Sequence, residues 1–246
     1  MTNECQQPRG PQSDHARRGI LCGGGGKWGR KAISGLTKIE MLVIMTSVVI
    51  IFLLWFVPST LKARSNAKRI YCNNLLKNTT MGFRMWSNDY DNRFPWQVST
   101  NAIGRNSPGT LELITLMSPA IHFQVASNEI GSPTLLTCPS DRDRQVVSNW
   151  SQLTRTNISY FINLEANTTN QCSTLIGDRN LAINNKAVVP GLIIVTADEA
   201  LKWDGRFHGQ IGNIGFGDGS VQQVVSKDLN PLLRSSGVAT NRFVIP

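Results

Sequence analysis

The sequence contains no second long apolar run, and this absence limits its membrane topology. Between Met41 and Pro58 no residue is charged, whereas the rest of the chain is rich in Asn, Ser and Thr and has no comparable run. At 1.5 Å per residue, a helix of this length covers about 27 Å, which is close to the hydrocarbon thickness of a bilayer. The chain is therefore expected to cross a membrane at most once.

Several binding motifs are also missing. The formal net charge is +9, but the basic residues form no stripe with interleaved aromatic side chains, so no nucleic-acid partner is expected. The glycine run at residues 23–26 lacks the lysine and hydroxyl residue of a phosphate-binding loop and is typical of a flexible linker. No two of Cys72, Cys138 and Cys172 have metal-ligand spacing, so we expect no cysteine-based zinc site.

After Pro58 the helical pattern continues on one face. Residues spaced by 4, 3, 4, 3 and 4 form a single stripe, namely Cys72, Leu76, Thr79, Phe83, Trp86 and Tyr90. The stripe predicts the face on which the helix packs against a soluble domain, rather than a cofactor site. The helix should end near residues 88–92, before the segment at residues 94–96 that cannot continue it.

The C-terminal half carries strand and turn signals. A short helix is predicted at residues 110–116 and a turn at residues 138–141, with strands at 158–163 and 192–197. A hairpin is predicted at residues 210–216 and 221–225, because Asp218-Gly219 and the flanking residues supply the positive φ of a tight turn. The expected fold class is α+β, a long N-terminal helix packed on a small, mainly antiparallel sheet.

The segment before the apolar run is basic and low in complexity. Residues 1–35 contain six basic and two acidic residues, which favours a cytoplasmic leader by the positive-inside rule. The basic cluster after the run, at residues 62–69, favours the opposite orientation. Cleavage as a secretory signal peptide is the alternative, although its apolar region is normally only about 7–15 residues long and ends at a small-residue site.

Residues 30–58 resemble the processing and membrane segment of the type IV pilin and type II secretion pseudopilin superfamily. The resemblance rests on the basic leader, on Gly35 before the cleavage point and on Glu40 at the fifth position of the mature chain. Leu36 stands where the family usually has Phe, and Lys38 stands where an apolar residue is common. The resemblance implies that a prepilin peptidase cuts between Gly35 and Leu36 and methylates the new amine of Leu36.

Glu40 has a physical argument of its own. An ionised carboxylate beside a membrane-spanning run is costly unless it is paired, so a partner is expected. In the family this partner is the N-terminal amine of a neighbouring subunit, which gives Glu40 a role in assembly. The alternative is that Glu40 lies at the headgroup boundary without an assembly role.

A second resemblance covers the C-terminal part. His208-Gly209, Gly212-Asn213 and Phe216 to Gly219 are similar to the H-X9-DG segment of pilin-like proteins from planctomycetes and verrucomicrobia, and nine residues separate His208 from Asp218. The segments at residues 138–141 and 177–180 also resemble that group. The resemblance does not define what the segment does.

Acidic residues near this segment suggest a metal site. Oxygen-rich loops can hold structural calcium, and the candidate ligands are Asp198, Glu199, Asp204, His208 and Asp218. The alternative is that the Asp-Gly pair is only a turn and the histidine only a satisfied strand-end residue. No cofactor is required by the sequence. An exported domain is also expected to form one disulfide among Cys72, Cys138 and Cys172, without the pairing being defined.

Together these features predict a prepilin-like structural subunit rather than an enzyme. The expected organisation is a leader at 1–35, a membrane or filament-core helix at 36–58, its amphipathic continuation at 59–90 and an exported domain at 91–246. The implied partners are the prepilin peptidase, other pilin or pseudopilin subunits and an inner-membrane assembly platform. The chain would lie in the bacterial inner membrane before it enters a filament. Two alternatives remain, a non-polymerising membrane-anchored module that binds glycan, calcium or protein, and a membrane-tethered hydrolase that uses His208.

Overall fold

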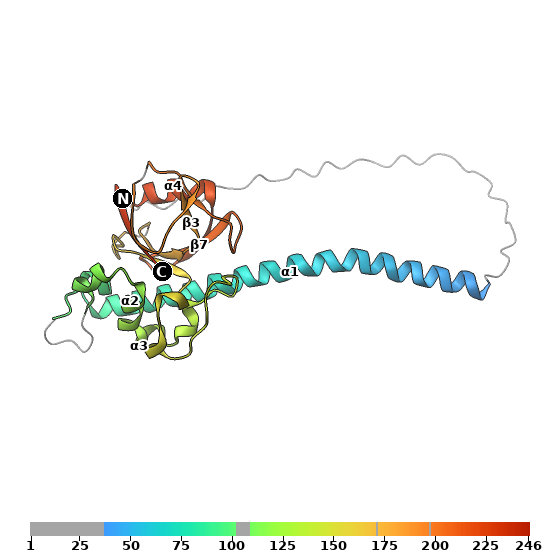
Figure 1. Cartoon of the computed structure of the whole chain (residues 1–246), viewed down its shortest axis with the longest axis horizontal. Coiled ribbons are helices and arrows are strands. Elements are labelled where there is room, and N and C mark those ends of the chain that lie inside the picture. The colour runs from blue at the N-terminus through green and yellow to red at the C-terminus, as the bar shows by residue number, and fades with distance from the viewer. Residues whose placement is uncertain (1–36, 102–108, 171, 197) are drawn as a thin grey trace, which may run out of the picture. The chain divides into compact units, whose positions relative to one another are not determined.

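The computed structural model describes residues 37–101, 109–170, 172–196 and 198–246, and it describes only the backbone of residues 57–62. The predicted cleavage point between Gly35 and Leu36 lies outside these residues. The chain divides into two compact units, residues 1–62 and residues 63–246. The helix α1 (Lys38–Asp89) contributes to both units, and antiparallel sheets follow it, so the α+β class is confirmed (Figure 1).

The first half of α1 is apolar and uncovered. Its segment Lys38–Phe56 has a mean hydropathy of 2.5, and none of these 19 residues is buried. Among the described residues this is the one helix that is long and apolar enough to cross a membrane. The structure is therefore compatible with a single-pass protein.

The second half of α1 packs through the predicted stripe. Five of its six residues have no exposed surface and Tyr90 is 7% exposed, so the prediction of a packing face is confirmed. Aromatic rings from later segments meet the stripe, since Phe83 lies 5.5 Å from Trp96 and 5.2 Å from Phe123 between ring centroids. The helix ends where Asp91 and Asn92 adopt left-handed backbone angles, as expected for short polar residues after a helix.

Six strands form the main sheet, in the order β5-β9-β1-β2-β7-β8, and every neighbouring pair is antiparallel. The strands are β1 (Tyr160–Asn163), β2 (Thr174–Asp178), β5 (Gly191–Thr196), β7 (Ile211–Phe216), β8 (Val221–Val225) and β9 (Thr240–Ile245). The predicted β7–β8 hairpin is confirmed. Its turn places Gly219 at φ +91°, and a Cβ there would lie 2.8 Å from Met81 Sδ, so glycine is required.

Smaller elements complete the globular unit. A second sheet has the order β4-β3-β6, with β3 (Leu181–Ile183), β4 (Lys186–Ala187) and β6 (Leu201–Trp203). The helices are α2 (Pro119–Val125), α3 (Ser127–Ile130) and α4 (Ser226–Ser235), with 3-10 turns η1 (Pro95–Gln97), η2 (Leu111–Leu116), η3 (Pro133–Leu136), η4 (Trp150–Gln152) and η5 (Arg155–Asn157). The sheet region is thus larger than the small sheet that the sequence predicts.

The interior strands of the main sheet are buried on both faces. Tyr160 and Ile162 of β1 belong to a core shared with α1, whereas Phe161 between them belongs to a second core shared with α4 and the smaller sheet. Side chains alternate between faces along a strand, so the two cores lie on opposite sides of the sheet. Strands of this kind carry apolar residues at consecutive positions and lack the polar alternation of a half-exposed strand.

Replacing His122 of α2 with glutamine is expected to flatten the pH dependence of stability. His122 is 1% exposed, and its Nδ1 lies 2.7 Å from Thr110 Oγ1; burial lowers its pKa to about 4. The unfolded chain takes up a proton near pH 6.5 and the folded chain does not, so the free energy of unfolding falls as pH drops from 6.5 to 4. The wild type should lose about 3 kcal/mol more than His122→Gln over this window.

The measurement is urea unfolding of the detergent-solubilised chain, followed by tryptophan fluorescence at several pH values. Because other titrating groups are common to both proteins, the difference between wild type and variant isolates His122. Parallel curves for the two proteins would contradict a neutral buried imidazole at this position.

Candidate functional site

Four buried side chains from distant parts of the sequence lie close together, and one of them belongs to α1. We call them the His208 cluster: Cys72 of α1, Cys138 after η3, Asp178 at the end of β2 and His208 in the loop before β7. Cys72 and Cys138 form a disulfide across 66 residues of sequence, which is one of the pairings that the sequence left open. His208 Nε2 lies 3.3 Å from Cys138 Sγ and 3.8 Å from Asp178 Oδ2.

The loop between β6 and β7 positions the imidazole. A bridge between Gly205 and Gly209 closes this loop, and both glycines have positive φ, which lets the chain turn tightly around His208. Burial, with a contribution from the positive charge of Arg69, lowers the pKa of His208 to about 4. The imidazole is therefore neutral at neutral pH and can act as a hydrogen-bond acceptor or a metal ligand.

Asp178 is the buried acid of the cluster. Its Oδ2 accepts hydrogen bonds from the backbone N–H and the side-chain amide of Asn213, at 2.8 and 2.9 Å. Its side chain has no exposed surface, and burial raises its pKa to about 7, although the Asn213 hydrogen bonds oppose the shift. A carboxylate in this position is costly in its charged form unless a cation lies beside it.

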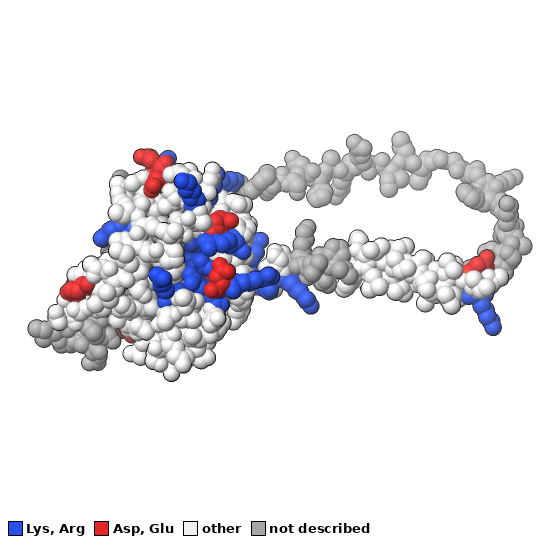
Figure 2. All heavy atoms as spheres, viewed as in Figure 1, with Lys and Arg blue, Asp and Glu red and all other residues white. Residues whose placement is uncertain are grey.

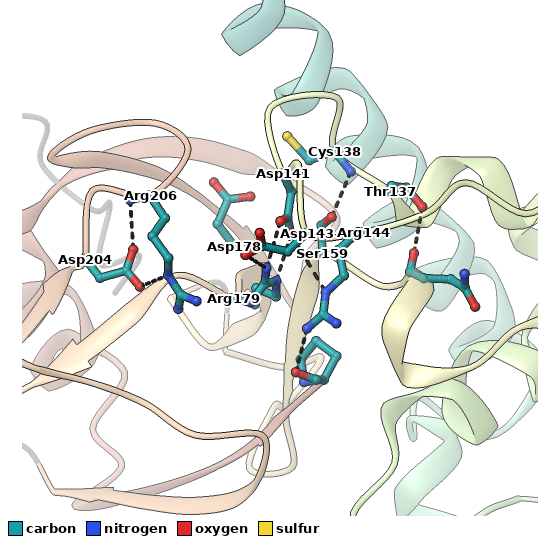
Figure 3. Close-up of polar contacts among 12 residues, drawn as sticks. Thr137, Cys138, Asp141, Asp143, Arg144, Ser159, Asp178, Arg179, Asp204 and Arg206 are labelled. Carbon is teal, nitrogen blue, oxygen red and sulfur yellow. Dashed lines mark hydrogen bonds and ion pairs between the residues drawn. The ribbon is translucent and has the colours of Figure 1, made fainter.

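A buried ion-pair network borders the cluster. Arg179 donates from Nε and Nη2 to the two oxygens of Asp141, both at 2.7 Å, and Nη2 also lies 3.0 Å from Asp143 Oδ2 (Figure 3). Arg144 donates to the backbone oxygen of Pro246 at 2.8 Å and so fixes the C-terminal residue. Figure 2 shows basic side chains gathered on one face of the globular unit, with acidic side chains between them.

The predicted turn at residues 138–141 connects the cluster and the network. The Asp141 N–H donates to the Cys138 carbonyl at 2.9 Å, which closes the turn, and the Cys138 N–H donates to Ser159 Oγ at 3.0 Å. One end of the turn therefore holds the sulfur that bonds to α1, and the other holds the carboxylate that pairs with Arg179. This gives the Cys-Pro-Ser-Asp segment a structural role that sequence spacing alone does not reveal.

The structure separates the two ends of the H-X9-DG segment. His208 precedes β7 and Asp218 follows it, and a six-residue strand spans about 20 Å. Asp218 Oδ1 accepts the Ser220 N–H at 2.8 Å within the hairpin turn. The nine-residue spacing therefore equals a strand with its flanking residues.

Four of the calcium ligands predicted from sequence have local partners in the structure. Asp198 lies 3.5 Å from Arg234, Glu199 accepts the Thr196 N–H, Asp204 pairs with Arg206, and Asp218 closes its turn. Among the described residues, the one group of three or more His, Cys, Asp or Glu side chains close enough to share a metal ion is Cys72, Cys138 and His208. Folding brings these three residues together, although their spacing in the sequence is not that of metal ligands.

Glu40 has a partner within its own chain. Its Oε2 accepts the backbone N–H of Thr37 at 2.8 Å and the Thr37 hydroxyl at 2.9 Å, and its own N–H lies 3.4 Å from that hydroxyl oxygen. This is a capping box, in which the residue before the helix and the third helical residue satisfy each other's orphan groups. The capping role of Glu40 was not predicted, although the Thr-x-x-Glu pattern is typical of it.

Comparisons with known proteins identify no relative of this chain: no family model, no curated protein and no solved structure matches it.

Proposed function

We propose that this protein is a prepilin-like structural subunit, cleaved after Gly35, N-methylated at Leu36 and assembled into a type II secretion pseudopilus or a type IV pilus-like filament. The observation that carries the proposal is the uncovered apolar segment Lys38–Phe56, which directly follows the predicted cleavage point. Within the described part of the chain no residue of this segment is buried. A membrane would cover this segment before assembly, and other subunits would cover it in the filament.

The shape of such a contact favours a filament. A helix that inserts its apolar surface among the helices of other copies makes a head-to-tail contact, and such contacts produce open helical assemblies when they do not close into a ring. Residues 36–58 would form the filament core, and the domain from residue 91 onward would form the outer surface. The peptidase, the inner-membrane assembly platform and other subunits would be the partners.

Glu40 would give the contact its register. It is the only acidic residue between Lys38 and Phe56, and in the described chain its carboxylate is held by Thr37. Cleavage would create a charged amine at Leu36, and the amine of a neighbouring copy would compete for the carboxylate. Pairing the two charges removes the cost of burying either one in an apolar core.

The first test is the mature N-terminus. The full chain is expressed with a prepilin peptidase, and the membrane-fraction protein is analysed by mass spectrometry. A terminus at N-methylated Leu36 is the expected result, and Gly35→Leu should leave the chain uncut. An uncut wild-type chain, or cleavage after the apolar segment, would remove the basis of the proposal.

The second test separates the filament subunit from a monomeric membrane anchor. Glu40→Ala should be processed normally but should lose the cross-linked multimers that the wild type forms in membranes. Thr37→Val is the matched control, because it removes the hydroxyl contacts of the cap and leaves the carboxylate in place. Equal loss in both variants would assign Glu40 to the helix cap alone, and unchanged multimers in Glu40→Ala would favour the anchored binding module.

A further inference from the structure

We propose that the dithiol form of this protein binds one zinc ion through Cys72, Cys138 and His208, with Asp178 beside the site. The inference concerns the His208 cluster and does not depend on filament assembly. The candidate ligand atoms of the two cysteines and the histidine lie within 4.8 Å of one another, and all three residues are buried. Two thiolates and one imidazole are ligand types that zinc takes in proteins.

The distances around His208 fit a tetrahedral site. With ligand bonds of about 2.0–2.3 Å, neighbouring ligand atoms of a tetrahedral zinc site lie about 3.3–3.8 Å apart. His208 Nε2 is already 3.3 Å from Cys138 Sγ. The Cα atoms of Cys72 and Cys138 are 5.3 Å apart, so side-chain rotation in the dithiol form can open the sulfur pair to the required separation.

The charge at the cluster also favours a cation. Asp178 is fully buried, and among the described residues no lysine or arginine forms an ion pair with it. Its Oδ1 is a buried polar atom without a hydrogen-bond partner in the described part of the chain. A cation beside Asp178 would offset the cost of burying its charge.

Metal binding and the disulfide are alternative states of the same sulfur atoms. Two thiols bind a zinc ion by releasing two protons to solvent. An external disulfide could later oxidise the two thiolates by thiol-disulfide exchange. It takes two electrons from the thiolates and two protons from solvent and becomes a dithiol. The Cys72–Cys138 bond forms in the same step, and the ion is released. Both states join α1 to the turn at residues 138–141, so the ion would hold these elements together before oxidation does.

The test uses the full chain in detergent, reduced under anaerobic conditions with a phosphine and freed of metal. Cys5, Cys22 and Cys172 are replaced with serine, so that Cys72 and Cys138 are the only thiols. Cobalt is the spectroscopic probe, because thiolate ligands give it a charge-transfer band, and zinc is counted by elemental analysis. The reduced protein should bind one equivalent of either metal, and reoxidation should release it.

Variants of the imidazole ligand give the matched comparison. His208→Gln should weaken cobalt binding at least about 100-fold, because even residues that only orient a metal ligand change affinity by 10–100-fold. His122→Gln removes a second buried histidine outside the cluster and should leave cobalt affinity unchanged. Asp178→Asn should retain the thiolate band with weaker binding. Absence of uptake by the reduced protein, or equal affinity in His208→Gln and the wild type, would overturn the assignment.

Discussion

Replacing both Cys72 and Cys138 with alanine is expected to lower the free energy of unfolding of the globular unit by about 4 kcal/mol. The disulfide closes a loop across 66 residues, and it restricts the unfolded chain more strongly than a short loop would. It also joins α1 to the turn that leads to the buried ion-pair network. Loss of the bond should therefore loosen the contact between the helix and the rest of the domain.

Urea unfolding of the detergent-solubilised chain, followed by tryptophan fluorescence, measures this loss. A thiol reductant provides the control, since in metal-free buffer it should destabilise the wild type by more than it destabilises the double alanine variant. Hydrogen exchange should rise most in α1 between residues 63 and 89. If the variant and the oxidised wild type unfold at the same urea concentration, the disulfide contributes nothing to stability.

Replacing Arg179 with methionine is expected to cost about 3–5 kcal/mol, because it leaves a buried carboxylate without its partner. The side chain of Asp141 is 1% exposed and accepts two hydrogen bonds from the Arg179 guanidinium. Arg144 is 4.0 Å away and would compensate only in part. The cost arises mainly from the unpaired charge rather than from the lost pair itself.

Two further variants test that explanation. Arg242→Met breaks the half-exposed pair with Glu165 and should cost no more than about 1 kcal/mol. The double variant Asp141→Leu with Arg179→Met should be more stable than Arg179→Met alone, because it removes the stranded charge. If the double variant is no better than the single one, packing rather than electrostatics explains the loss.

The elements that could be predicted from sequence are those with a local signal. The stripe of α1 was readable because its period of about 3.6 residues survives from Cys72 to Tyr90, and the β7–β8 hairpin was readable because Asp218-Gly219 marks a tight turn. The single membrane-length segment follows from composition alone. Glu40 illustrates a limit, because the same Thr-x-x-Glu pattern fits both a helix cap and an assembly contact.

The strands β2 and β9 were missed for a physical reason. Both lie in the interior of the main sheet and are covered on both faces, so their sequences lack the alternation that marks a half-exposed strand. Asp178 within the apolar segment of β2 was the available signal, since an acid among buried residues indicates a functional or paired charge. Local motifs give no means of finding the residues that surround Asp178.

The sequence by itself determined the membrane-length helix, the basic leader, the amphipathic face of α1 and the turn of the last hairpin, because each depends on residues within a few positions of one another. Only the tertiary structure decided which cysteines pair, that the predicted calcium ligands lie apart, and that His208 meets Cys138 and Asp178 rather than Asp218. These contacts join residues 30 to 70 positions apart. Packing on the two faces of a sheet brings these residues together, and such packing produces no periodic pattern in the sequence.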